Sequence, residues 1–301
     1  MSINSLATAS RYTGELDKIF TEKSAVGFLA DNNLRSRFVG AKTVIMPDID
    51  FVGLADYNRD TGFSQGAVTV SQTAYTLTKD RGRSFMIDRE DMDETGVMSL
   101  AGQVLSEFIR TEVVPEVDAY TISKLAGVAA DNGHVETYNE AKALTQLLSM
   151  INALQASVGY DTELVAFIDN TMKAAIENDE KISKQIVVSD FKQGDIHLRI
   201  KSLDGVALIP VQDSRMKSAY TFDAGTTTTA GGFAPTEDAQ SIRALVLPKK
   251  GASLVKKSET LRIFAPEQNV KADAYKFDYR LYYDTFVKKS ELGNIYALQT
   301  A

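Results

Sequence analysis

Residue types that commonly carry enzyme chemistry are scarce in this chain of 301 residues. It contains no cysteine, which excludes disulfides, thiolate nucleophiles and cysteine metal sites. Its two histidines, His134 and His197, are too few for a metal cage of several histidines, and we expect both to be structural or exposed. We predict no nucleophile elbow, and no phosphate-binding loop around Gly231 and Gly232. A metal-independent hydrolase whose carboxylates meet only in space stays open as the catalytic alternative.

The acidic clusters have ordinary structural interpretations. The run 88–94 precedes an apolar periodic segment, where the helix macrodipole favours each carboxylate by roughly 0.3–1 kcal/mol. It lacks the alternating ligands and the central glycine of a calcium loop. The triplet Asp48-Ile49-Asp50 resembles the acidic pair of sugar-nucleotide enzymes, but such triplets are common by chance. We therefore predict no catalytic residue, no metal ligand and no cofactor-binding residue.

Composition indicates a globular protein without a dedicated nucleic-acid-binding face. The chain is 44% hydrophobic and 24% charged, with a net charge of −7, whereas a nucleic-acid binder normally carries a basic face. Residues 1–14 are polar and lack the apolar run of a signal peptide. No stretch reaches the roughly 20 apolar residues that a membrane span needs. We therefore expect synthesis in a cytoplasm.

The stretch that organises the chain runs from residue 97 to residue 130. Its apolar residues recur at steps of three and four, the spacing of one helical face; they are Val97, Leu100, Ala101, Val104, Leu105, Phe108, Val113, Val117, Tyr120 and Leu125. About 30 helical residues would make a rod roughly 45 Å long. Pro115 interrupts the pattern and is expected to kink a helix. The pattern fits one long rod or two core helices that meet at Pro115 equally well.

Strand patterns flank this helix on both sides. Residues 41–51 predict a strand, and 67–90 predict polar antiparallel strands with a turn at 79–83. Such a hairpin is too polar to be stable alone and must lie on another surface. Residues 275–283 alternate aromatic and charged side chains, which predicts a strand with one aromatic face that packs on the long helix.

A second unit of mixed strands and helices is predicted from about residue 136 to 260. Residues 141–158 form a clean helical stripe that Gly159 ends, and Asp169 or Asn170 is expected to cap the next helix. Strands are expected at 163–168, 186–188, 197–200, 206–211 and 242–247. The Gly/Thr-rich segment 223–236 is interpreted as an exposed, mobile loop. The lysine pairs 249–250 and 256–257 are interpreted as solvated surface.

Four runs of sequence resemble one known family in the same order along the chain. They are KSAVGFLADNNLRSRFVGAKTV, EFIRTEVVPEVDAYTISKLA, DGVALIPVQDSRM and KADAYKFDYRLYYDTFV. Together they resemble the major capsid proteins of tailed bacteriophages with the Hong Kong 97 fold. The resemblance implies an α+β fold with a spine helix and an extended β-hairpin loop. It also implies the following division: N-terminal arm 1–40, extended loop 41–90, peripheral domain 91–135 and 261–301, and axial domain 136–260.

The resemblance further implies a structural protein and not an enzyme. Its members self-assemble as pentamers and hexamers into an icosahedral head that encloses double-stranded DNA, contacted non-specifically. Arms and loops tie neighbours together, and a mildly acidic wall would not trap the polyanion. A separate scaffolding protein and a portal protein are the expected partners, with assembly in the bacterial cytoplasm and residence in the virion. Some relatives crosslink through a loop lysine; Lys79 lies in the corresponding region, but we predict no crosslink.

Other shell or phage roles are the alternatives. An encapsulin-like nanocompartment would use the same fold around cargo enzymes, and co-purifying cargo would identify it. A phage tail protein would polymerise into tubes, and a decoration protein would sit on a shell formed by another chain.

Overall fold

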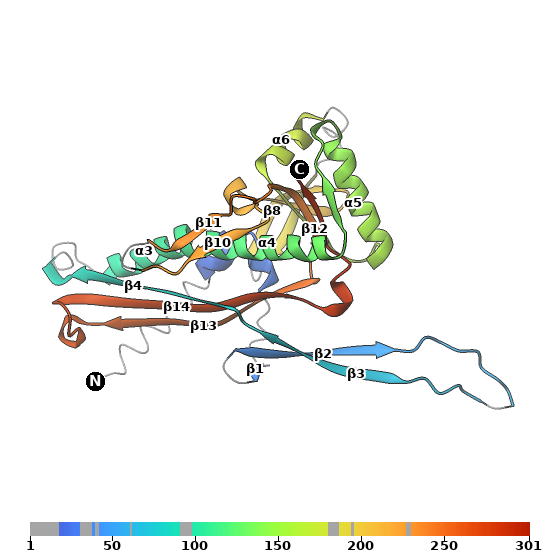
Figure 1. Cartoon of the computed structure of the whole chain (residues 1–301), viewed down its shortest axis with the longest axis horizontal. Helices are drawn as coiled ribbons and strands as arrows, with labels where there is room; N and C mark the ends of the chain where they lie inside the picture. Colours follow the sequence, from blue (N-terminus) through green and yellow to red (C-terminus); the bar gives the residue numbers. More distant parts are fainter. Residues whose placement is uncertain are drawn as a thin grey trace.

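The computed structural model describes residues 18–30, 38–39, 42–60, 62–90, 98–179, 187–193, 196–226 and 230–301. Figure 1 shows an elongated molecule in which one long helix and long strands run side by side. A wedge formed by a larger sheet and two helices stands on one half of the long helix. A thin two-stranded hairpin projects beyond the rest of the chain.

The long helix is one continuous run through Pro115. It consists of α3 (Met98–Phe108), the π-helical turn η3 (Ile109–Val113) and α4 (Val114–Asp131). The rod is therefore confirmed, and the alternative of two helices that meet at Pro115 is wrong. The N–H of Val114 donates to the carbonyl of Ile109, five residues back. This wider turn changes the hydrogen-bond register just before Pro115, which has no N–H and would otherwise crowd the carbonyl of Thr111.

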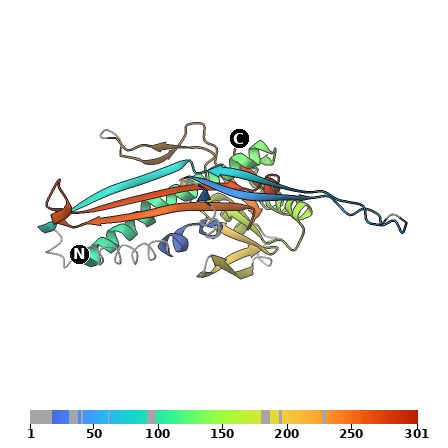
Figure 2. The same cartoon turned by 90° about the horizontal axis from the view of Figure 1, so that it is seen from below.

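A three-stranded antiparallel sheet lies along this helix (Figure 2). Its order is β13 (Ala252–Phe264), β14 (Ala274–Val287) and β4 (Lys79–Asp88). The alternating face of β14 is buried at Phe277, Tyr279, Leu281 and Tyr283. Ring centroids of Phe108 and Tyr279 lie 5.8 Å apart, and those of Tyr120 and Tyr283 lie 5.6 Å apart. The predicted packing of the aromatic strand on the long helix is confirmed.

The hairpin predicted around residues 79–83 is wrong. β3 (Val68–Thr76) pairs with β2 (Thr43–Phe51), which also pairs with the short β1 (Phe38–Val39). The chain then passes through Leu77 and Thr78 into β4, which belongs to the other sheet. Gly82 lies inside β4, where an added Cβ would come within 2.7 Å of the carbonyl oxygen of Tyr279. The glycine allows close approach of two strands, and it was misread as a turn signal.

The wedge contains a seven-stranded mixed sheet among the described residues. Its order is β5 (Val135–Thr137), β15 (Tyr296–Gln299), β12 (Ile242–Pro248), β6 (Leu164–Ile168), β9 (Val206–Pro210), β8 (Ile196–Leu203) and β7 (Val187–Gln193). The parallel pairs are β15–β5 and β6–β9. The sheet therefore includes β15, from the segment that the resemblance groups with the long helix, because β15 pairs antiparallel with β12.

Two helices pack against this sheet as the sequence predicts. α5 (Ala143–Val158) ends at Gly159, whose φ is 87°, a value that glycine adopts at low cost. α6 (Asn170–Asn178) begins after Asp169, whose side chain accepts a hydrogen bond of 2.7 Å from the N–H of Met172. The stripe of α5 is buried together with the inner residues of β6 and β12.

The Gly/Thr-rich segment is partly ordered by strand pairing. β10 (Tyr220–Asp223) and β11 (Gly232–Pro235) form an antiparallel pair, and Phe222 reaches the ring of Tyr120 on the long helix, 5.7 Å between centroids. The interpretation of 223–236 as a free loop is therefore wrong at its two ends, and residues 227–229 lie outside the described part of the chain.

Short helical turns complete the described fold. Residues 18–23 are helical, and the 3₁₀ turns are η1 (Gly27–Leu29), η4 (Glu140–Lys142), η5 (Asp213–Arg215), η6 (Pro266–Gln268) and η7 (Lys289–Glu291). The acidic run 88–94 lies largely outside the described residues, so its predicted place at the helix start stays a prediction.

Two glycine substitutions test whether Gly82 is needed for the close contact between strands β4 and β14. We expect Gly82→Ala to lower the free energy of unfolding by about 1–3 kcal/mol, because the new methyl group must displace β14. Gly127 lies on the exposed side of α4 with open space around its Cβ position, so Gly127→Ala is expected to raise that free energy by about 0.5–1 kcal/mol. Urea titrations of the two variants test this, and equal effects would contradict the account of Gly82.

Candidate functional site

The two histidines lie far apart and do not form a site. His134 stacks on Tyr296 with ring centroids 4.3 Å apart and an interplanar angle of 5°. His197 lies in β8, five strand positions from β5, which is roughly 24 Å at the usual strand spacing. No group of three His, Cys, Asp or Glu residues that could hold a metal ion occurs within the described ranges. The predicted absence of catalytic, metal and cofactor residues stays a prediction.

One sequence pattern typical of hydrolases occurs in a context that does not suit it. Residues 62–66 read Gly-Phe-Ser-Gln-Gly, which has the spacing of a nucleophile elbow and which the sequence analysis passed over. An elbow connects a strand to a helix. Here Ser64 is exposed in the loop that connects β2 and β3, so a strand follows it. This context gives Ser64 none of the elbow's geometry.

The basic residues 249–257 do not form one solvated surface. Lys250 is exposed and Lys249 pairs with Glu163 at 2.7 Å, as surface residues do. Lys256, however, is only 4% exposed, and its Nζ lies 3.8 Å from the ring centroid of Phe20. The solvated interpretation is therefore wrong for Lys256, which contacts the helical segment 18–23 from β13.

A buried carboxylate on the long helix binds the segment that contains residues 18–30. Asp118 is 0% exposed and accepts hydrogen bonds from Ser24 Oγ (2.6 Å) and from the N–H groups of Ala25 (3.1 Å) and Val26 (3.4 Å). Arg215 Nη1, from η5, lies 3.0 Å from the same carboxylate. Burial raises the pKa of Asp118, and these donors oppose that shift. Asp118 thus ties three separate segments together within one chain.

A second polar joint connects β4, the long helix and the β10–β11 hairpin. Arg81 donates from Nε and Nη2 to Glu116 at 2.8 and 3.0 Å. It also donates to the carbonyls of Asp223 and Gly232, at 2.6 and 3.0 Å. Hydrogen bonds to Glu116 raise the pKa of Arg81. Such bidentate pairs have defined geometry as well as charge, so Arg81 fixes the hairpin over the helix.

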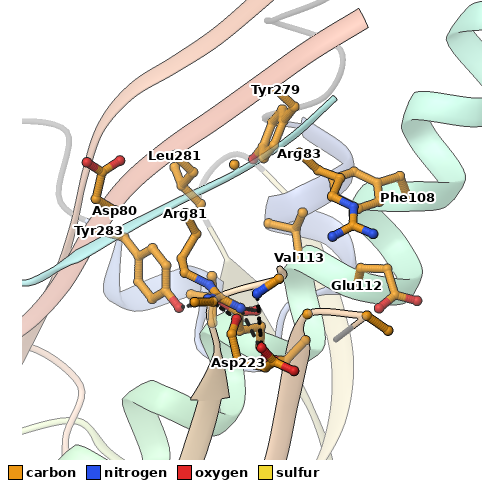
Figure 3. A pocket seen from close by; sticks show the side chains of 18 of the residues that line it. Asp80, Arg81, Arg83, Phe108, Glu112, Val113, Asp223, Tyr279, Leu281 and Tyr283 are labelled. Atoms are coloured by element: carbon orange, nitrogen blue, oxygen red, sulfur yellow. Dashed lines mark hydrogen bonds and ion pairs between the residues drawn. The ribbon is translucent and has the colours of Figure 1, made fainter. Parts of the chain in front are cut away.

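The second joint lines a pocket of about 510 Å³ beside the β10–β11 hairpin. Figure 3 shows its lining from β4, the long helix and β14, with Arg83 and Glu112 beside Phe108. Its described lining contains no serine, histidine or lysine. Nearby, Lys79 Nζ lies 3.8 Å from the ring centroid of Phe222, and burial lowers the pKa of Lys79. The lining offers contact surface and lacks a nucleophile–base pair.

The projecting hairpin β2–β3 carries the largest group of exposed apolar side chains among the described residues. They are Phe51, Val52, Leu54, Tyr57, Phe63, Val68 and Val70, each at least 58% exposed. The rings of Tyr57 and Phe63 contact one another, 4.9 Å between centroids. Figure 1 shows that this end extends away from the remainder of the molecule. A two-stranded hairpin is marginal alone, and exposed apolar groups of this kind mark interaction surfaces.

A hairpin that needs a partner surface is predicted for residues 67–90, whereas the projecting hairpin is β2–β3, and its apolar end is not predicted from the sequence. Leu54, Tyr57 and Phe63 stand within the segment that connects its two strands. These three apolar residues in an otherwise largely polar segment were the sequence signal for an exposed apolar end. Within the described residues, no helix is both long enough and apolar enough to span a bilayer.

Asp118 gives a direct test of how residues 18–30 are attached. We expect Asp118→Ala to lower the free energy of unfolding by about 3–5 kcal/mol, because the partly buried Arg215 loses its counter-charge and the donors of residues 24–26 lose their buried acceptor. Ser24→Ala removes a single donor and is expected to cost only about 1 kcal/mol. Urea titration gives both values, and hydrogen exchange of residues 18–30 is expected to accelerate more in Asp118→Ala. Unchanged exchange there would contradict the attachment.

Comparisons with known proteins identify the architecture. No family model matches the chain, and no curated protein matches it by sequence. Solved structures do match: a capsid structure of cyanophage P-SCSP1u is 13% identical, with a TM-score of 0.56 over 88% of this chain and 85% of that one. A structure from Gordonia phage Cozz is 10% identical, with a TM-score of 0.57 over 93% and 87%. A virus-like particle from Pyrococcus furiosus is 10% identical, with a TM-score of 0.50 over 95% and 99%.

These likenesses cover 88–95% of the chain. The chain therefore has the α+β fold of tailed-phage major capsid proteins, the Hong Kong 97 fold.

Proposed function

We propose that this chain is a structural protein that assembles into the icosahedral head of a tailed bacteriophage. The observation that supports it most is the fold likeness to capsid structures over nearly the full length. The projecting hairpin adds independent support, because none of the described parts of the subunit covers its apolar end. A shell of repeated subunits supplies such a surface at every position.

In this proposal the subunits form pentamers and hexamers. The hairpin of one subunit reaches a different surface on the next, which is a heterologous contact, and such contacts form rings when the rotation closes. The wedge is assigned as the axial domain at the centre of each ring. The long helix with its three-stranded sheet is assigned as the peripheral domain, β2–β3 as the extended loop, and the N-terminal residues as an arm.

The proposed head encloses double-stranded DNA. A chain with a net charge of −7 would contact DNA weakly and non-specifically, which suits packaging and release. Assembly would take place in the bacterial cytoplasm with a separate scaffolding protein and a portal protein, and the finished shell would be part of the virion.

An encapsulin-like compartment is the second candidate. The virus-like particle from Pyrococcus furiosus supports it, because that likeness covers 95% of this chain and 99% of that one. The two roles differ in what the shell encloses, which is DNA in a phage head and cargo protein in a compartment. Nuclease-protected DNA inside purified particles would indicate a phage head, and stoichiometric cargo protein would indicate a compartment.

Electron microscopy and light scattering of the purified protein test the assembly itself. We expect closed shells, or rings of five or six subunits, when the chain is expressed alone or together with its neighbouring genes. A uniform 32.9-kDa monomer under both conditions would contradict a shell role. Tubes would indicate a tail protein.

Substitutions at the hairpin end test its role in assembly. We expect the double variant Leu54→Ser, Phe63→Ser to shift material from shells to free subunits, because each contact loses buried apolar area. Tyr160 and Val270 are equally exposed but lie elsewhere, at 83% and 101%, so Tyr160→Ser, Val270→Ser is the matched control. Sedimentation measures the shell fraction, and normal shells from the hairpin variant would exclude this surface from assembly.

A further inference from the structure

The direction of the projecting hairpin is decided at a two-residue link. β3 ends at Thr76 and β4 begins at Lys79, yet these strands belong to different sheets. Leu77 and Thr78 therefore join the projecting hairpin to the sheet that packs on the long helix. A rotation of the hairpin as a unit would therefore involve this link.

The base of the hairpin is held mainly by apolar contacts, together with one hydrogen bond of 3.3 Å from the hydroxyl of Tyr75 to the carbonyl of Val287. Leu77 is 3% exposed and packs in a small cluster with Val44, Met46, Val255 and Phe286. The ring of Tyr75 lies 5.0 Å from that of Phe286. Contacts of this kind are non-directional, so the strands can shift over one another while the cluster stays buried.

A buried carboxylate supplies the directional bonds at the link itself. Asp284, on β14, is 0% exposed, and its Oδ2 accepts hydrogen bonds from both the N–H (3.0 Å) and the Oγ1 (2.8 Å) of Thr78. Its Oδ1 accepts from Tyr120 OH (2.8 Å) and Lys124 Nζ (2.5 Å) on the long helix. One oxygen therefore contacts the link and the other contacts the helix.

We propose that Asp284 is a positioning residue that sets the angle between the projecting hairpin and the long helix. The carboxylate is charge-paired with Lys124 and accepts from both the link and the long helix, which makes it a stiff, directional joint. The inference rests on the proposed function in one respect. If each hairpin contacts a neighbouring subunit, the angle at Asp284 fixes how steeply subunits meet, and therefore the curvature of the shell.

The angle can be measured with a pair of spin labels. The chain contains no cysteine, so Ser64→Cys at the exposed hairpin end and Gln103→Cys on the exposed side of α3 give a clean label pair. Full-length labelled chain is diluted into unlabelled chain, so that only distances within one molecule are recorded. We expect one narrow distance distribution for the parental protein, whether assembled or not.

Variants at the joint are expected to broaden that distribution. Thr78→Val removes the Oγ1 hydrogen bond at a surface-accessible position, and Asp284→Asn removes the charge and replaces one acceptor oxygen by a donor group. Thr78→Ser retains both bonds and is expected to retain the narrow distribution. The matched control is Thr121→Val, which removes the buried bond between Thr121 and Thr285 hydroxyls (2.9 Å) at the same helix–sheet interface without contacting the link.

Two outcomes overturn the proposal. If Thr78→Val and Asp284→Asn both keep the parental distance distribution, Asp284 does not set the angle. If the distribution broadens but electron microscopy shows shells of parental diameter, the angle does not control curvature; mixed diameters are expected instead, with parental shells for Thr121→Val. Failure of the parental chain to form shells would count against the proposed function alone, because the distance measurement does not require assembly.

Discussion

Burial of the long helix against the aromatic face of β14 is the interaction on which the other parts of this molecule depend. A helix about 50 Å long offers a continuous surface, and the rings of Phe108, Tyr120, Tyr279 and Tyr283 interlock along it. Neither element would be stable alone. Because the packing is apolar, it gives stability but specifies little about the angle at which other segments attach.

Carboxylates at this interface provide the specificity that apolar packing lacks. Asp118 binds the segment before β1, Glu116 receives Arg81 and Tyr283 (3.1 Å), and Asp284 binds the link to the projecting hairpin. Each of these three carboxylates accepts hydrogen bonds from donors in different parts of the chain, as charges removed from water require. The long helix is thus a common frame, and each carboxylate fixes the position of one attached segment.

Sequence patterns predicted the helices and strands that have a local signal, such as periodicity or a capping residue. They failed where a residue's role depends on a contact with a segment distant in the sequence. The α5 stripe, its end at Gly159, the Asp169 cap and the aromatic alternation of β14 are local signals, and all are confirmed. Gly82 and Lys256 were misread because their roles come from Tyr279 and Phe20, far away in sequence. The π-turn before Pro115 has no composition signal at all. The contacts of Asp118 and Asp284 likewise depend on tertiary structure, so the pattern could not reveal them.

The contrast between paired buried charges and exposed apolar side chains shows which part of the molecule has surface available for contact. Buried charges along the helix are paired, and the described pocket lining lacks a nucleophile–base pair. The largest group of exposed apolar side chains among the described residues comprises Leu54, Phe63 and their neighbours, at the end of a hairpin that reaches past its own fold. Such local violations of otherwise consistent design are expected at functional positions. An exposed apolar hairpin end is unfavourable for an isolated subunit. In an assembly of identical subunits, each such end can be buried against a neighbour. These physical features therefore support the assembly role that we propose.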